Sequence, residues 1–324
     1  MVASLSTSSS KPAKRVIVFA LLVALLDLGL GAVLARIYRQ SFTGDRFGLL
    51  NYALTQEPQV LVLGSSRAQF QIMPSVLTKE LGLTAYNAGL KGQDFLYSVM
   101  LYDLWKRRHP PPKVLALTID IESLIPRETE INTAHIVAPY LDESQLVREI
   151  LYSGGPFKRF EYLSSTYRFN GTVLSLAKHA FNRPPPSYDG FLVLDGTLDP
   201  TRETGVLNAL DQDRTAAEMA QVPFSPQKLA YLRALTEETA RDGTRFFLVH
   251  TPIFRQDQAA HAAWVKELQA TLATMPGVTF VDLCIATHPK LFAGPELYFN
   301  LNHLNAEGAE ILTMLLAEEI KRHP

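Results

Sequence analysis

Residues 60–67 of the chain read VLVLGSSR, an apolar run that ends in a glycine, two serines and an arginine. The four apolar residues, followed by Gly64, have the pattern of a short buried strand. A serine at a strand-to-helix turn can expose its hydroxyl above a sheet, where backbone N–H groups offer an anion site. A plain turn with a helix cap explains the same residues without any chemistry. The segment therefore predicts a strand and leaves the role of its serines open.

The pattern of residues 60–63 recurs along the chain, with helical stretches in between. We predict five strands, at Val60–Leu63, Ala85–Asn87, Val114–Ile119, Phe246–Val249 and Val278–Leu283. The predicted helices are Phe95–Arg107, Pro226–Arg241, Ala259–Ala273 and Ala306–Arg322. This alternation is typical of βαβ units, so we expect an α/β fold of the flavodoxin-like kind, a three-layer α/β/α sandwich around a central parallel sheet. In such sheets the chemistry lies outside the carboxyl ends of the strands.

Residues 126–223 interrupt this rhythm. They contain the run Pro184-Pro185-Pro186 and the pair Gly154-Gly155, and they are too many for an ordinary connection. We therefore predict an inserted, partly helical subdomain within one α/β domain that spans residues 45–324.

The N-terminal region, residues 1–40, carries the longest apolar run. Val16–Leu34 would extend for about 28 Å as a helix, close to the thickness of a bilayer core. Three basic residues precede the run and two follow it, a bias that does not alone fix the orientation. A short basic start before an N-terminal apolar segment normally stays in the cytoplasm. We therefore expect a single-pass transmembrane helix in the inner (cytoplasmic) membrane, with the domain on the extracytoplasmic, periplasmic side. A cleaved signal peptide, with a small-residue site at 33–35, is the alternative, and it also exports the domain.

Asp27 lies inside this apolar run. A carboxylate within a membrane is costly, which indicates either a partner helix or polar cavity, or a position near the interface from which the side chain snorkels.

The composition excludes several classes of protein. Of the 324 residues 47% are apolar and 19% are charged, and the formal net charge is -1. Without a basic excess the chain is not an electrostatic nucleic-acid binder. Its single cysteine, Cys284, excludes a disulfide scaffold and a zinc finger, and we assign it no function. No nucleotide-binding glycine fingerprint or metal-ligand cluster is visible in the sequence, so we expect neither a cofactor nor a metal.

A second polar motif, YFNLNHLNAEGA at residues 298–309, precedes the last predicted helix. His303 is placed there to reach another loop at the same sheet edge and to act as a general base. Asn305 suits the N-cap of the helix, which explains part of the motif without catalysis.

Together, Gly64-Ser65-Ser66 and His303 resemble the SGNH (GDSL-type) hydrolase superfamily. The resemblance implies that Ser66 is the nucleophile and His303 the base. The segment Tyr86–Leu90 is similar to the family's second block, which implies that the N–H of Gly89 helps to form an oxyanion hole.

The chain departs from the family pattern at two positions. Asn300 stands where the family has the aspartate that orients the histidine, and Asp282 is an alternative partner at a strand end. Asp120 stands near the family's oxyanion asparagine, although a carboxylate cannot donate a hydrogen bond unless it is protonated.

Arg67 is predicted either to bind a carboxylate or an acyl oxygen, or to be solvated. His250 ends a strand and either lines the pocket or packs in the core.

The resemblance is greatest to membrane-anchored envelope proteins, such as alginate-acetylation and D-alanylation proteins that work beside a multipass membrane acyltransferase. It implies a serine-dependent acyltransferase or esterase that acts on O-acetyl groups of an extracytoplasmic polysaccharide. A catalytically weak module that binds glycan or scaffolds a modification complex is the alternative, and a tethered lipase or thioesterase is a third hypothesis.

Overall fold

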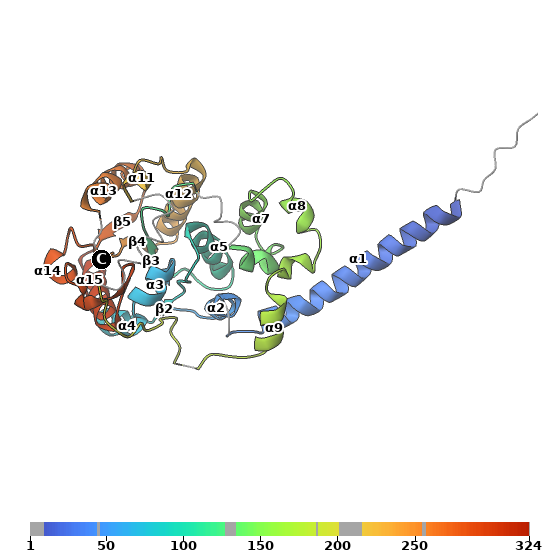
Figure 1. The fold of residues 1–324 in the computed structure, drawn as a ribbon, viewed down its shortest axis with the longest axis horizontal. Helices are drawn as coiled ribbons and strands as arrows, with labels where there is room; N and C mark the ends of the chain where they lie inside the picture. Colours follow the sequence, from blue (N-terminus) through green and yellow to red (C-terminus); the bar gives the residue numbers. More distant parts are fainter. Residues whose placement is uncertain are drawn as a thin grey trace, which may run out of the picture.

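Five parallel strands form the centre of the molecule in a computed structural model, which describes residues 10–43, 46–126, 134–185, 187–200, 216–254 and 257–323 (Figure 1). The strands lie in the order β2-β1-β3-β4-β5. Their bounds are β1 (Val60–Leu63), β2 (Ala85–Asn87), β3 (Val114–Ile119), β4 (Arg245–His250) and β5 (Val278–Asp282). The predicted α/β class and all five predicted strands are confirmed, with shifts of one residue at the ends of β4 and β5.

Helices cover both faces of this sheet. They are α2 (Arg46–Ala53), α3 (Ser66–Gln71), α4 (Pro74–Leu81), α5 (Phe95–Lys106), α12 (Pro226–Arg241), α13 (Gln258–Leu272), α14 (Pro289–Phe292) and α15 (Ala306–Arg322). The four predicted helices are confirmed to within one residue at each end. The sequence did not predict α2, α3 or α4, which are eight residues long or shorter.

The strands are apolar on both faces, and successive residues enter different cores. Leu61 and Leu63 pack with residues of α5, α12 and α13 in one cluster. Val60 and Val62 pack with residues of α3, α4 and α15 in the other. Each strand residue points away from its neighbour, so a continuous apolar run is what a sheet covered on both sides requires.

The strand order determines where a site can form. β1 pairs in parallel with both β2 and β3. It is therefore the point at which the chain connections turn to opposite sides of the sheet, and such a switch point leaves a crevice at the carboxyl ends of the strands. The residues after β1 and those after β3 meet there.

The region predicted as an insert is partly helical where the structure describes it. It contains η1 (Ala134–Tyr140), α7 (Gln145–Tyr152), α8 (Lys158–Glu161), η2 (Tyr167–Phe169), α9 (Val173–His179) and α11 (Ala216–Met219). Between α9 and α11, residues 187–200 contact the α/β core. The N–H of Asn87 donates to the carbonyl of Asp189 at 2.9 Å, and the N–H of Leu192 donates to the carbonyl of Gln69 at 3.0 Å. Below, residues 157–181 are called the apolar insert segment.

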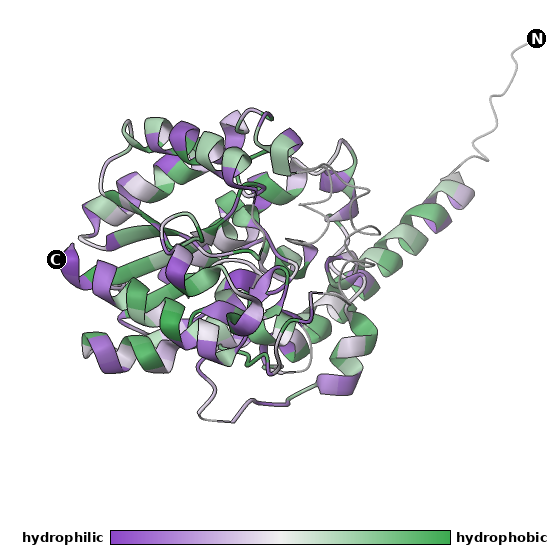
Figure 2. Cartoon of the chain, turned by 60° about the vertical axis from the view of Figure 1, so that its left-hand side comes forward, coloured by the Kyte–Doolittle hydropathy of each residue, from purple (hydrophilic) through white to green (hydrophobic). Residues whose placement is uncertain are grey.

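Helix α1 (Ser10–Arg39) projects away from the body and is apolar along most of its length (Figure 2). By length and composition it could cross a membrane. Asp27 on this helix is hydrogen-bonded to the apolar insert segment. Its carboxylate accepts hydrogen bonds from the Ser164 hydroxyl at 2.7 Å, from the backbone N–H groups of Ser165 and Thr166 at 2.7 and 3.2 Å, and from the Thr166 hydroxyl at 2.5 Å.

These bonds predict the effect of Asp27→Ala. Hydrogen bonds to a charged group contribute about 1.5–3 kcal/mol each, so their loss should speed amide exchange at Ser165 and Thr166 by about tenfold or more. Hydrogen exchange read by mass spectrometry on the purified full chain measures this. Asp142→Ala is the matched control, because it removes only an exposed ion pair with Arg168 in the same region. Equal exchange at residues 164–166 in both variants would contradict the anchoring role of Asp27.

Candidate active site

Ser66 lies where β1 turns into α3. Gly64 makes this turn with φ of 142°, and a Cβ added to it would lie 1.9 Å from Oγ1 of Thr118. Ser65 then caps the helix, since its hydroxyl accepts from the N–H of Arg67 at 3.4 Å. Ser66 is the first helical residue, so its N–H has no partner within the helix. The turn thus fixes the hydroxyl of Ser66 above the carboxyl end of β1.

His303 is held by a small antiparallel hairpin, β6 (Tyr298–Asn300) and β7 (His303–Leu304). Asn300 pairs with His303 across it. Behind the hairpin, Asn305 caps α15 by accepting from the N–H of Gly308 at 3.0 Å. The expected cap is therefore present, and it leaves His303 at the turn to face α3.

Ser66, His303 and Asn300 form a hydrogen-bonded chain. Nε2 of His303 lies 2.8 Å from Oγ of Ser66, and Nδ1 lies 3.0 Å from Oδ1 of Asn300. The same Oδ1 accepts the backbone N–H groups of Asn302 and His303, both at 3.0 Å. Two N–H donors identify this atom as the amide oxygen, so Nδ1 of His303 carries a proton and Nε2 is left to accept from Ser66. The amide thus selects the tautomer that a general base needs.

Further contacts hold Ser66 and His303 together, although 237 positions separate them in the sequence. The Gln71 side chain, at the end of α3, donates to the carbonyl of Asn302 at 3.0 Å. The ring of Phe70 meets the His303 ring edge-on at 5.3 Å between centroids. Both contacts come from the helix that Ser66 begins, so they hold the imidazole against that helix.

The electrostatics keep His303 neutral. Burial lowers its pKa, and the positive charge of Arg67 lowers it further, to about 4. At neutral pH the ring is therefore an uncharged acceptor.

Arg67 is paired with Asp120 rather than solvated. Nε of Arg67 lies 3.8 Å from Oδ2 of Asp120, and both side chains are largely buried. Burial alone would raise the pKa of Asp120, but Arg67, with His250 and hydrogen bonds from Glu122 and Ser123, holds it below its usual range. Asp120 is therefore ionised, and an ionised carboxylate accepts hydrogen bonds but cannot donate one to an oxyanion. Nη1 of Arg67 is buried without a hydrogen-bond partner among the described residues, beside the cavity that Arg67 helps to line.

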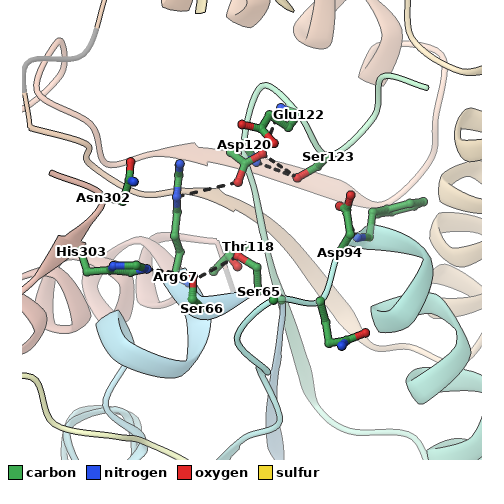
Figure 3. A pocket seen from close by; sticks show the side chains of 14 residues that line it. Ser65, Ser66, Arg67, Asp94, Thr118, Asp120, Glu122, Ser123, Asn302 and His303 are labelled. Atoms are coloured by element: carbon green, nitrogen blue, oxygen red, sulfur yellow. Dashed lines mark hydrogen bonds and ion pairs between the residues drawn. The ribbon is translucent and has the colours of Figure 1, made fainter. Parts of the chain in front are cut away.

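A polar cavity of about 220 Å³ opens over Ser66 and His303 (Figure 3). Its lining includes Ser65, Asp94, Thr118, Glu122, Ser123 and Asn302, along with Arg67 and Asp120. The Thr118 hydroxyl is buried without a hydrogen-bond partner among the described residues. Asp94 and Asn302 were not predicted as site residues. Asp94 is the N-cap residue of a predicted helix, and Asn302 is next to His303 in the sequence. Neither position distinguishes a residue that lines a cavity from an ordinary turn residue.

The N–H of Gly89 has a different contact from the one that the resemblance implies. Its N–H already donates to Oδ1 of Asn87 at 2.9 Å, and it is not among the residues that line the cavity. A Cβ at this position would lie 2.5 Å from Cβ of Ala68, so the glycine lets its loop pack closely on α3. The predicted oxyanion donor at Gly89 does not fit this arrangement.

His250 and Asp282 also lie outside the cavity lining. Nδ1 of His250 donates to the carbonyl of Ile119 at 3.1 Å, and burial lowers its pKa to about 4. Of the two interpretations of His250, the packed, hydrogen-bonded one is correct. Asp282 lies 3.3 Å from Nε2 of His261, so it is engaged away from His303. His250, His261 and Asp282 are close enough to hold a metal ion, but the His261–Asp282 pair accounts for their arrangement without one.

Comparisons with known proteins give structural likenesses only. No protein-family model matches this sequence, and no curated protein matches it. One similar solved structure is from Streptococcus pneumonia and is described as a candidate platelet activating factor; it shares 14% identity, covers 94% of this chain and 99% of its own, and has a TM-score of 0.40. Another is an acetyl xylan esterase from the rumen bacterium Butyrivibrio proteoclasticus, with 9% identity, coverage of 82% and 63%, and a TM-score of 0.35. These scores are low, so we derive no property of this chain from either protein.

Replacing Arg67 should change the pH profile of the site. Because the charge of Arg67 lowers the pKa of His303, Arg67→Gln should raise that pKa from about 4 toward the ordinary histidine value. A base works only when it is deprotonated, so the acidic limb of Ser66 reactivity should move to higher pH. The rate of labelling by a fluorophosphonate probe, measured from pH 4 to 8, follows that limb. Arg233→Gln, at an exposed residue of α12 that bonds to Thr274, serves as the control. An unmoved limb in Arg67→Gln would contradict the assignment.

Asn300→Asp should strengthen the base. The carboxylate would keep the three hydrogen bonds and add a negative charge beside Nδ1, which raises the pKa of His303. Charge-assisted hydrogen bonds are about twice as strong as neutral ones, so we expect hydrolysis of a simple acetyl ester to rise by about tenfold. Steady-state hydrolysis measures it, with Asn182→Asp, an exposed asparagine outside the cavity lining, as the control. If Asn300→Asp leaves the rate unchanged, Asn300 is not the third member of the chain.

Proposed function

We propose that this protein is a membrane-anchored serine-dependent acyltransferase or esterase of SGNH type, acting on O-acyl groups of an extracytoplasmic polysaccharide. The observation that carries the proposal is the hydrogen-bonded chain from Ser66 through His303 to Asn300, with distances of 2.8 and 3.0 Å. A nucleophile, a base and a group that orients the base are the parts that acyl transfer through a serine requires.

In this mechanism Oγ of Ser66 attacks the acyl carbonyl while Nε2 of His303 takes its proton. The tetrahedral intermediate collapses when the departing alcohol oxygen receives that proton from His303, which leaves the acyl group on Ser66. A second hydroxyl, from a sugar or from water, attacks the acyl-serine, and His303 takes and returns its proton in the same way. The N–H of Ser66 and the guanidinium of Arg67 are the groups placed to stabilise the negative oxygen.

The cavity supports a hydroxyl-rich substrate. Asp94 and Glu122 can accept hydrogen bonds from sugar hydroxyls, and the side chain of Asn302 can both donate and accept. A lipase or thioesterase with a long acyl chain would need an apolar channel, and the described lining offers Phe95 as its one large apolar side chain. This favours a glycan ester over a lipid ester.

The anchor supports the proposed location. Helix α1 is long and apolar enough to cross a bilayer, which would hold the domain beside the outer face of the cytoplasmic membrane. An acyl donor delivered through the membrane by a multipass acyltransferase would reach Ser66 from that side. Such a partner is part of the proposal and would account for a transferase without a soluble donor site.

A second candidate function has one observation in its favour. The orienting group Asn300 is uncharged, so it stabilises the protonated His303 less than an aspartate would. A glycan-binding module with little or no catalysis is compatible with that weakness, because the polar cavity would serve binding alone.

Labelling with a fluorophosphonate probe separates these functions. The full chain should label, and Ser66→Ala should lose the label, because the probe bonds to an activated serine oxygen. Ser65→Ala is the matched control: it removes only the helix cap and should still label. Folded wild-type protein that does not label between pH 4 and 9 would contradict the enzymatic function and leave the binding module.

A further inference from the structure

The bonds of Asp27 fix the depth of the apolar insert segment relative to α1. Asp27 lies twelve residues from Arg15 and twelve from Arg39, which is about 18 Å of helix in either direction. Within the apolar run it lies seven residues, or about 10 Å, before Leu34. If residues 16–34 cross the hydrocarbon core, then Ser164, Ser165 and Thr166, bonded directly to Asp27, lie below the plane at which the run ends.

The close packing of this contact excludes a loose tether. Gly31 follows Asp27 by one helical turn, and a Cβ at Gly31 would lie 2.3 Å from Cβ of Ser165. Helix α9 also packs against α1 (Figure 1). Sliding α1 far enough to lift this contact into water would draw Lys14 and Arg15 into the hydrocarbon, which is costly.

The surface of the apolar insert segment fits such a depth. Among the described residues outside α1, every large apolar side chain that is at least 60% exposed lies in this segment: Phe157, Phe160, Leu163, Leu174 and Phe181, at 60–88% exposure. Phe157 is the N-cap residue of α8 and Phe160 lies within the helix, three residues further on. Water does not favour so many exposed rings and leucines in one region.

Basic residues accompany this apolar surface. Arg159 lies between Phe157 and Phe160, Lys178 follows Leu174 by one turn, and Arg183 follows Phe181 by two residues. Apolar side chains at acyl-chain depth, with basic neighbours at the level of the phosphates, are typical of elements that lie in a membrane interface.

We propose that the apolar insert segment is embedded in the outer-facing leaflet of the bilayer, held there by the Asp27 contact, so that the domain lies on the membrane instead of hanging from a flexible stalk. The occupant of this surface is lipid, because the surface continues that of α1. The inference rests on the membrane anchoring in the proposed function and not on its acyl chemistry.

Single-cysteine fluorescence tests the proposal on the full chain in vesicles of phosphatidylethanolamine and phosphatidylglycerol. Leu163→Cys and Leu174→Cys, each labelled with the environment-sensitive dye NBD, should show blue-shifted emission and lose most of it to doxyl-labelled lipids. The native Cys284 is buried, so we expect it to react little with the dye. Wild-type protein treated with the dye measures the signal that remains from this cysteine. Leu291→Cys on α14 is the control for an exposed leucine on another element, and it should keep its emission.

Leu22→Cys on the free part of α1 separates the two ways in which the proposal can fail. If Leu22→Cys is quenched but Leu163→Cys and Leu174→Cys behave like Leu291→Cys, the helix spans and the embedded segment is wrong. That result would leave the apolar surface to a protein partner, since these vesicles hold this chain alone. If Leu22→Cys is not quenched, the anchor itself is wrong and the inference falls with it, while Ser66 labelling would be unaffected.

Discussion

The parallel pairing of β1 between β2 and β3 is the constraint on which the site depends. Because β1 is flanked on both sides, the turn after it cannot spread along the sheet and must rise directly into α3. The end of β3 adjoins this turn so closely that Thr118 leaves room only for a glycine at position 64. Ser66 from one strand and Asp120 from the other are therefore brought to one cavity by backbone pairing alone.

Asp120, one of three carboxylates that line the cavity, does not orient the histidine as the aspartate of a serine triad does. Asn300 orients His303 with a neutral oxygen, whereas Asp120 places its charge beside Arg67. The geometry of the base is preserved, since three N–H groups converge on one amide oxygen. A neutral oxygen does not stabilise the positive charge of the imidazolium as a carboxylate would. The pKa of about 4 likewise means that protonated His303 is disfavoured. The site keeps its base deprotonated over a wide pH range but makes it weak.

The sheet and its long helices could be predicted from sequence because apolar runs and helical periods are local signals. The hairpin that pairs Asn300 with His303 could not, because its strands are three and two residues long. Ser66 and His303 were predicted to meet, and they do. The engagement of Gly89 by Asn87 was missed because a side-chain acceptor for a particular N–H leaves no pattern in the sequence. Likewise, the partner of Asp27 lies 137 residues away in a segment whose fold the sequence does not specify.

Arg67 would have opposite effects on the two charges that develop in the proposed acyl transfer. Burial is the main cause of the lowered pKa of His303, and the charge of Arg67 lowers it further. The same charge would favour a negative oxygen on a bound substrate. Asp120 moderates both effects, because its charge offsets that of Arg67 at a distance of 3.8 Å. In a tetrahedral intermediate the imidazolium and the negative oxygen exist together, so the guanidinium stabilises one member of the pair at the expense of the other. In the proposed reaction, an arginine–carboxylate pair fixed at this position would make the site depend on oxyanion stabilisation more than on the strength of its base.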